Sequence, residues 1–285
     1  MVTRDGFHAA DMQEMFAAVS ELYARYWHEY FHFALFEGDE TWDEAFGRTH
    51  DRYVRALRVA DARQTLEMAC GRGGFAEIMA RNTSGKVTGI DISDTQLSRA
   101  RQRVLPNLTF RRHDIMQVHE LPETFDAVAF MDAACYLPDK ALAIRRTAQV
   151  MRPGGRLLWI DWCRAEGLTP VQEELVLEPF MRYWAIPSLE TGEAYEVHFR
   201  PYFHILEAED LNHCTRRNWE YAYESAIRAI KELTLENLPG LVDKAASLGP
   251  ECLRLIKEQF PAALYIRAGF DAGFLRYKYY LLERR

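Results

Sequence analysis

The sequence predicts an α/β protein: one parallel sheet with helices on both faces, a helical cover before it and helical insertions after it. Three observations support this class. From residue 64 to 162, short apolar runs alternate with helix-length stretches, the pattern of a parallel sheet. Residues 10–36 contain no glycine or proline and carry apolar groups at helical spacing. Prolines and aromatic residues interrupt the alternation within residues 163–210.

The N-terminal part is predicted to be helical. Residues 10–36 fit one or two helices, and a further helix is expected over residues 42–58, after the turn at Glu37-Gly38-Asp39. We therefore divide the chain into a helical cover over residues 1–60 and a sheet domain with insertions over residues 61–285.

Five apolar runs are the expected parallel strands, and a helix is expected between the second and third of them. Ser93 and Gln96 are spaced as a capping box that opens this helix, over residues 94–104. Arg152-Pro153-Gly154-Gly155 stops the helix before the last run. The runs are 65–68, 87–90, 108–111, 127–130 and 157–160.

The C-terminal part is mixed. Residues 163–210 and 224–260 are expected to be insertions that cap the substrate, the second of them mostly helical. Residues 216–223 and 274–282 are rich in aromatic residues and are expected to be strands.

Composition excludes several classes of protein. The chain has 35 basic and 42 acidic residues and a net charge of −7, which argues against a nucleic-acid partner. No apolar run is long enough to insert stably in a membrane, and residues 1–11 lack the order of a signal peptide. The five cysteines form no C-x-x-C pair, so we expect no metal site and a cytoplasmic location. The sequence is compatible with a homo-oligomer.

The strongest motif is the stretch Leu66–Phe75, a strand that runs into a glycine-rich turn and then a helix. Glycine lets a ligand approach the backbone closely, and the helix that follows offers free N–H groups. Gly71 and Gly73 also satisfy a dinucleotide fingerprint, with Asp91 at the position that binds ribose. The turn alone is therefore also compatible with a nicotinamide-dependent oxidoreductase.

Acidic residues at three successive strand ends favour another ligand. Glu67, Asp91 and Asp114 each end or follow an expected strand. Glu67 would repel a pyrophosphate but would attract a cationic, amino-acid-like group. The three positions therefore predict a pocket for a ligand that carries ribose and amine groups.

The E-x-A-C-G-x-G-G turn, the acid at 91, the His113-Asp114 pair and the R-P-G-G turn resemble the class I S-adenosylmethionine-dependent methyltransferases over residues 64–162. The resemblance implies a Rossmann-like sheet and S-adenosylmethionine as the cofactor. Ala69 departs from the family, which usually has glycine there. The cofactor-binding residues implied are Glu67, Ala69, Gly71, Gly73, Asp91, Ile92, Gln96, Asp114, Ile115 and Met131.

Two further segments resemble the sterol and terpenoid C-methyltransferase branch. Trp27–Phe36 is similar to its aromatic segment, and Asp132-Ala133-Ala134-Cys135-Tyr136 to its E-A-x-C-H element. This resemblance implies methyl transfer to a small, largely apolar natural-product acceptor. C-methylation of a terpenoid or sterol is the first of the reactions that it implies. O- or N-methylation of another small metabolite is the alternative, followed by an inactive relative that only binds.

Methylation of an alkene needs aromatic faces for a developing cation and one base for the final proton. Spacing alone singles out no base. The predicted catalytic residues are Tyr26, His28, Asp132 and Tyr136, and further acceptor contacts are His32, Glu178, Tyr195 and His198.

Overall fold

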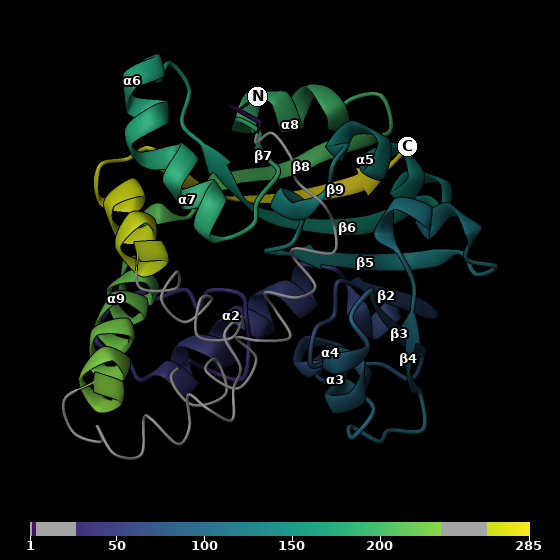
Figure 1. Ribbon diagram of the computed structural model, residues 1–285. Coiled ribbons are helices and arrows are strands. Elements are labelled where there is room, and N and C mark those ends of the chain that lie inside the picture. The colour runs from purple at the N-terminus through teal and green to yellow at the C-terminus, as the bar shows by residue number, and fades with distance from the viewer. Residues whose placement is uncertain (1, 4–26, 235–260) are drawn as a thin grey trace.

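The computed structural model describes residues 2–3, 27–234 and 261–285 (Figure 1). Its centre is a seven-stranded sheet with the order β4-β3-β2-β5-β6-β9-β8. Neighbours among β2 to β6 are parallel, as predicted, and β9 is antiparallel to both β6 and β8. The strands are β2 Gln64–Met68, β3 Lys86–Asp91, β4 Leu108–Arg112, β5 Phe125–Met131, β6 Met151–Arg164, β8 Phe203–Asp210 and β9 Leu275–Arg284.

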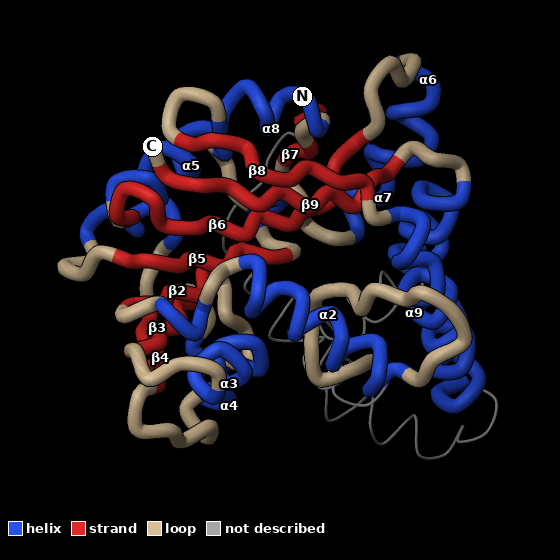
Figure 2. Tube along the Cα trace, turned by 180° about the vertical axis from the view of Figure 1, so that it is seen from behind, coloured by secondary structure: helices blue, strands red, loops and turns tan. Residues whose placement is uncertain are grey.

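Helices cover both faces of this sheet (Figures 1 and 2). A small second sheet pairs β1 (Val2–Thr3) with β7 (Ser188–Leu189), and residues 261–271 are also helical. The α-helices are α2 Trp42–Ala56, α3 Gly74–Arg81, α4 Asp94–Ala100, α5 Lys140–Gln149, α6 Pro170–Gln172, α7 Glu178–Tyr183, α8 Gly192–Phe199 and α9 Asn212–Thr234. The shorter turns are η1 Val59–Asp61, η2 Ile115–Glu120, η3 Ala134–Tyr136 and the π-helical η4 Glu173–Leu177.

The core has two layers because successive strand residues point to opposite faces. On β5 and β6, Ala129 and Ile160 belong to the cluster that includes residues of α2, α3 and α9. Their neighbours Phe130 and Trp159 belong to the cluster that includes α5 and α8. Trp159 is fully buried, and burial of one such side chain stabilises the fold by about 2–3 kcal/mol.

Polar side chains set where the helices begin. Thr41 and Glu44 form a complete capping box at the start of α2. At α4 only half of the predicted box exists: the Ser93 hydroxyl accepts from the Gln96 N–H at 3.4 Å. The Gln96 side chain is buried and has no hydrogen bond among the described residues, so that half of the prediction is wrong.

The Arg152–Gly155 turn lies within β6 as an irregularity. Met151 pairs with Phe125 and Arg156 with Ala127, so four residues on β6 stand opposite Asp126. The Asp126 carboxylate accepts from the N–H groups of Arg63 and Gln64, both at 2.9 Å, and thereby fixes the start of β2.

Two predicted elements differ from the structure. Residues 216–223 are helical, within α9, because Cys214, Asn218 and Trp219 are buried at helical spacing. Residues 27–36 form neither a helix nor a strand, and the rest of the predicted helical stretch, 10–26, lies outside the described residues. The predicted strand 274–282 is confirmed as β9.

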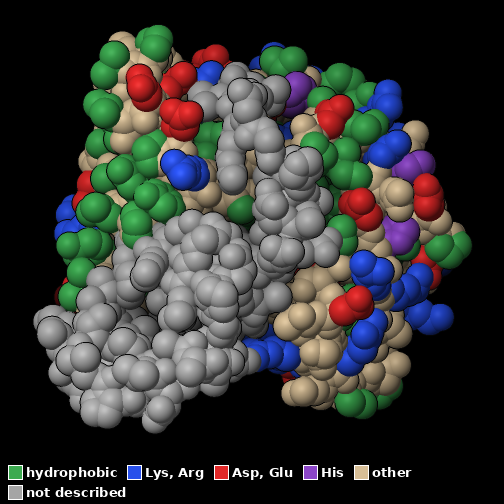
Figure 3. Space-filling model, viewed as in Figure 1, with side chains coloured by type: hydrophobic (Ala, Val, Ile, Leu, Met, Phe, Trp, Pro, Cys, Tyr) green, Lys and Arg blue, Asp and Glu red, His purple; other side chains and the backbone are tan. Residues whose placement is uncertain are grey.

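None of the helices in the described ranges has the length and apolar character needed to cross a bilayer. Apolar side chains do gather on the surface over α6 and η4 (Figure 3). Val171 and Leu175 there are 62% and 64% exposed.

Candidate active site

The glycine-rich turn joins β2 to α3 at the carboxyl end of the sheet. Gly71 and Gly73 have φ of 52° and 76°, in the left-handed region that glycine favours. Ala69 has φ 53° and adopts that region despite its Cβ, which costs roughly 1–2 kcal/mol. The position therefore suits the glycine that related methyltransferases are expected to carry.

Asp91, at the end of β3, holds this turn in place. One carboxylate oxygen accepts from the Gly71 N–H at 2.9 Å, and the other accepts from the Ser93 N–H at 2.8 Å. Burial raises the pKa of this carboxyl, and the two N–H donors offset part of the rise. Asp91 is thus fixed beside the backbone that a ligand would approach.

Glu67, near the end of β2, is a buried acid that can accept further hydrogen bonds. It is 5% exposed, and its Oε2 has no partner among the described residues. Burial raises its pKa well above the usual range, and Asp91 acts in the same direction, whereas a backbone hydrogen bond from Ala76 lowers it. A ligand ammonium group would satisfy this carboxyl, because an adjacent cation favours its ionised form.

The other predicted cofactor residues lie at neighbouring strand ends. The Asp114 carboxylate accepts from the Met116 N–H at 2.8 Å and caps η2. Both polar atoms of the Gln96 side-chain amide are buried without a hydrogen-bond partner among the described residues. Met131 is the last residue of β5. Ile92 and Ile115, which follow Asp91 and Asp114, are partly exposed. The orphaned polar atoms of Glu67 and Gln96 fit a ligand with several donors and acceptors.

An irregular segment, residues 27–36, packs on the glycine-rich turn. A Cβ at Gly74 would lie 2.7 Å from the Tyr30 ring, and one at Gly71 would lie 3.3 Å from Phe31. At Gly73 a Cβ would lie 2.5 Å from Phe110. Because they lack a Cβ, these glycines leave room for aromatic rings. The sequence pattern had been interpreted only as room for a ligand.

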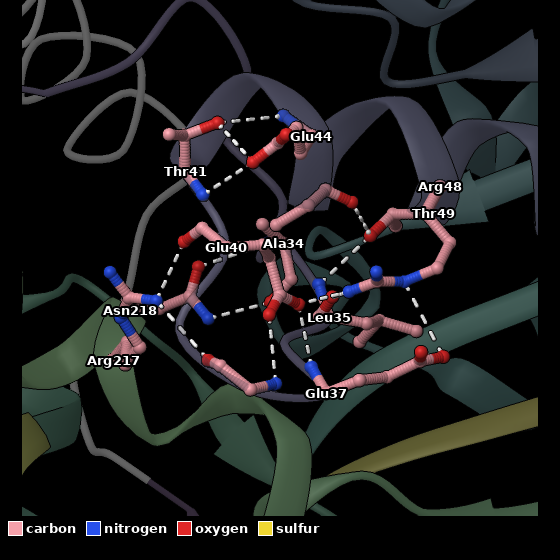
Figure 4. Close-up of polar contacts among 12 residues, drawn as sticks. Ala34, Leu35, Glu37, Glu40, Thr41, Glu44, Arg48, Thr49, Arg217 and Asn218 are labelled. Carbon is pink, nitrogen blue, oxygen red and sulfur yellow. Dashed lines mark hydrogen bonds and ion pairs between the residues drawn. The ribbon is translucent and has the colours of Figure 1, made fainter.

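Side chains of α2 and α9 bind the backbone of this segment (Figure 4). Asn218 accepts from the Ala34 N–H at 2.9 Å and donates to the Ala34 carbonyl at 2.8 Å. The Leu35 N–H donates to the Thr49 hydroxyl at 2.8 Å, and Arg48 donates to the Leu35 carbonyl at 3.2 Å. The backbone groups that a helix would use internally are satisfied by distant side chains, which explains the wrong helix prediction.

Asp132 lies directly after β5, on the loop that leads into η3. Its φ is 53°. Both carboxylate oxygens are buried, and neither accepts a well-aligned hydrogen bond from the described residues. Burial raises its pKa well above the usual range, Asp161 adds to the rise, and Tyr277 counteracts it. A strained, buried acid of this kind is typical of a functional position.

The remaining predicted acceptor residues have varied surroundings. Tyr136 is buried in η3, and Tyr26 lies outside the described residues. The His28 ring packs 4.0 Å from the Trp42 ring and 4.9 Å from Tyr221, and burial lowers its pKa. Glu178 is exposed on α7.

His32 and His50 form a buried pair with their Nε2 atoms 2.8 Å apart. Burial lowers the pKa of both rings, that of His50 to about 4. His198 lies 3.9 Å from Glu190, and the Tyr195 hydroxyl donates to Asp161 at 2.6 Å.

The sequence analysis missed Asp161 and Lys140. Asp161 interrupts the apolar run Leu157–Trp162 in the middle of the sheet and is fully buried. Lys140, the first residue of α5, is 3% exposed. A charged residue inside an otherwise apolar strand was the available signal, because buried charges need specific partners.

Comparisons with known proteins identify the family. A family model described as "Methyltransferase domain" matches residues 65–155. The chain is 30% identical to the 27-O-demethylrifamycin SV methyltransferase of Amycolatopsis mediterranei, over 78% of this chain and 83% of that one. It is 24% identical to the sterol 24-C-methyltransferase of Pneumocystis carinii, over 79% of this chain and 62% of that one.

Solved structures share the fold. The cyclopropane synthase MmaA2 from Mycobacterium tuberculosis superposes with a TM-score of 0.75 at 17% identity, covering 98% of this chain and 100% of that one. A geranyl diphosphate C-methyltransferase from Streptomyces coelicolor superposes with a TM-score of 0.64 at 15% identity, covering 98% and 100%.

The chain therefore belongs to the class I S-adenosylmethionine-dependent methyltransferases, with the Rossmann-like sheet of that family. It is an enzyme that uses S-adenosylmethionine to methylate small molecules, and this replaces the oxidoreductase and inactive-relative alternatives. Within the family it lies close to the sterol and terpenoid C-methyltransferases. Its matches cover 39% to 62% of the length of the sterol 24-C-methyltransferases.

Proposed function

We propose that the protein methylates a carbon atom of a largely apolar natural product, of terpenoid or sterol-like character. The observation that carries this proposal is Asp132, a strained residue after β5 whose carboxylate oxygens are buried. Phe33, Tyr53 and Tyr277 are buried in the same cluster as Met131, which precedes it. An acid in aromatic surroundings suits an acceptor that becomes cationic and then loses a proton.

The donor supplies a methyl group on a positively charged sulfur, which is already an activated leaving group. We assign its binding to the strand-end residues: Glu67 toward the amino group, Asp91 toward the ribose, and Asp114 with Gln96 toward the adenine. The turn at Ala69, Gly71 and Gly73 fixes the donor's position, and alignment of donor and acceptor is worth several kcal/mol.

Asp132 acts on the acceptor side. Burial raises the pKa of its carboxyl, and the positively charged donor would oppose this rise and favour the carboxylate. The ionised acid stabilises positive charge on the acceptor carbon skeleton and takes the proton that restores the double bond. Tyr136 and His28 remain proposed acceptor contacts. We likewise propose residues 1–60 as the cover and residues 163–210 and 224–260 as the substrate cap.

O-methylation is the second candidate, and one observation favours it. Of the two enzymes compared by sequence above, the rifamycin methyltransferase has the higher identity, and its name describes a 27-O-demethylated substrate. An oxygen acceptor needs a base that is unprotonated at neutral pH. The His32–His50 pair, whose pKa values are lowered, could supply such a group.

A labelled-methyl assay tests the proposal. The protein is incubated with S-adenosylmethionine carrying a labelled methyl group and with a panel of terpenoid and sterol alkenes, phenols and amines, and products are located by mass spectrometry and NMR. We expect the label on carbon, and at least a hundredfold lower kcat for Asp132→Asn with unchanged donor affinity. The exposed Glu174→Gln on η4 is the matched control. Label on oxygen or nitrogen alone would contradict C-methylation.

A further inference from the structure

A buried polar network lies directly behind the loop that carries Asp132 and Tyr136. Asp161 on β6 is fully buried. Its Oδ1 accepts from the Cys135 N–H at 3.1 Å, and its Oδ2 accepts from the Tyr195 hydroxyl at 2.6 Å. Asp161 therefore connects η3 to α8 through one carboxylate.

Lys140 holds the same loop from α5. Its buried ammonium donates to the carbonyls of Leu137 at 3.0 Å and Cys135 at 3.4 Å, and to the Ser188 hydroxyl at 2.7 Å. Both backbone groups of Cys135 are thus bound by charged side chains, the N–H by Asp161 and the carbonyl by Lys140. Hydrogen bonds to charged groups are roughly twice as strong as neutral ones.

This loop needs such support because Asp132 is strained. A non-glycine residue in the left-handed region persists only where its surroundings determine the conformation. The Asp132 N–H donates to the Ile160 carbonyl at 3.0 Å, next to Asp161 in β6. The backbone on both sides of the strained residue is thereby tied to the same stretch of one strand.

We propose that Asp161, Lys140 and Tyr195 are positioning residues that fix the Asp132–Leu137 loop and thereby set where the Asp132 carboxyl meets the acceptor. The inference rests on the proposed role of Asp132, but the network itself can be measured without any acceptor. Tyr195 and Ser188 belong to the insertion over residues 163–210, so the network also couples this proposed cap to the reactive acid.

The energetics agree with a positioning role. Burying a carboxylate and an ammonium costs several kcal/mol per ion, and apolar residues of similar volume often stabilise a fold as well or better. Asp161 and Lys140 do not form a direct ion pair within 4.0 Å among the salt bridges of the described residues. Their hydrogen bonds go to the loop and to the elements behind it, which gives a specific loop conformation in addition to the attraction between the two charges.

A pair of tyrosine variants tests the network. Tyr195→Phe removes the hydroxyl that binds Asp161. Tyr280→Phe removes an equally buried hydroxyl, which donates to the Gly192 carbonyl of α8 at 3.0 Å and has no hydrogen bond to the loop among the described residues. Amide hydrogen exchange of residues 132–137 is measured in both variants with no acceptor present. We expect exchange at least tenfold faster in Tyr195→Phe and unchanged in Tyr280→Phe.

Kinetics on the acceptor found in the labelled-methyl assay give the second readout. We expect kcat to fall about tenfold in Tyr195→Phe and Asp161→Asn, with the donor Kd within twofold of wild type, and to stay within twofold in Tyr280→Phe. Unchanged loop exchange in Tyr195→Phe, or equal effects of the two tyrosine variants, would overturn the network. Faster loop exchange without any loss of kcat would overturn its role in catalysis. Failure of the wild type to methylate any acceptor carbon would instead count against the proposed function.

Discussion

Replacement of Asp161 by asparagine should change how the stability of the protein depends on pH. Burial raises the pKa of this carboxyl from 3.8 to about 6, against the opposing effects of the Tyr195 hydroxyl and Lys140. Because the folded-state pKa is raised, the protonated acid contributes stability below about pH 4, and that contribution is lost as the pH rises through 6. A rise of this size corresponds to about 3 kcal/mol at neutral pH.

The magnitude that the experiment measures is smaller. Between pH 4.5 and pH 7.5 the linkage relation gives a loss of about 2 kcal/mol for wild type that asparagine, which does not titrate, would not show. Urea unfolding of both proteins at the two pH values gives the four free energies of unfolding. The quantity of interest is the difference between variant and wild type at pH 7.5 minus that at pH 4.5, so constant effects of the substitution cancel.

A shift of about 2 kcal/mol in favour of Asp161→Asn at the higher pH would confirm the reasoning. No shift, or a shift in favour of wild type, would show that the carboxyl is not a buried acid of raised pKa. Lys140→Met is a useful companion variant, because loss of the nearby cation should raise the Asp161 pKa further and enlarge the shift.

Three further outcomes are expected. Glu67→Gln should weaken S-adenosylmethionine binding at least tenfold in calorimetry, about 1.4 kcal/mol, and equal affinity would exclude its contact with the amino group. Ala69→Gly should raise the free energy of urea unfolding by up to about 1 kcal/mol, because the strain at φ 53° is relieved while glycine loses more chain entropy; a loss of stability would contradict this. His50, whose folded-state pKa is lowered to about 4, contributes stability above pH 6.5 that is lost as the pH falls toward 4. His50→Gln should therefore lose less stability than wild type between pH 7 and pH 4.5, and an equal loss would refute the assignment.

The sheet could be predicted from the sequence because its signals are local. Each of the five parallel strands is a short apolar run followed by a turn or cap, and all five form where the pattern placed them. The antiparallel β9 was predicted as a strand, but its position between β6 and β8 depends on pairs of residues that lie 111 to 127 positions apart for β6 and 68 to 81 positions apart for β8.

The wrong predictions concern segments whose partners are distant. Residues 27–36 have the composition of a helix, yet Ala34 and Leu35 bind side chains from α9 and α2. Residues 216–223 have the aromatic content of a strand, but the buried positions Asn218 and Trp219 fit a helix that packs on the sheet. Local propensity was outweighed by tertiary packing in both segments.

In the candidate site, too, residues with local sequence signals could be predicted and residues with distant partners could not. Glu67, Asp91 and Asp114 could be found because the carboxyl ends of adjacent parallel strands meet at one edge. Asp161 and Lys140 could not be assigned a role from the sequence, because their common partner, Cys135, has no distinguishing feature in the sequence. The loop they hold is revealed by its hydrogen bonds and by the left-handed conformation of Asp132.

Calorimetric titration with S-adenosylmethionine tests most directly whether the acids at the strand ends bind the methyl donor. Wild type and the control Glu174→Gln should bind it alike, whereas Asp91→Ala, which loses the group beside Gly71, should bind at least tenfold more weakly while still unfolding cooperatively. Equal affinity in wild type and Asp91→Ala would contradict the location of the donor site.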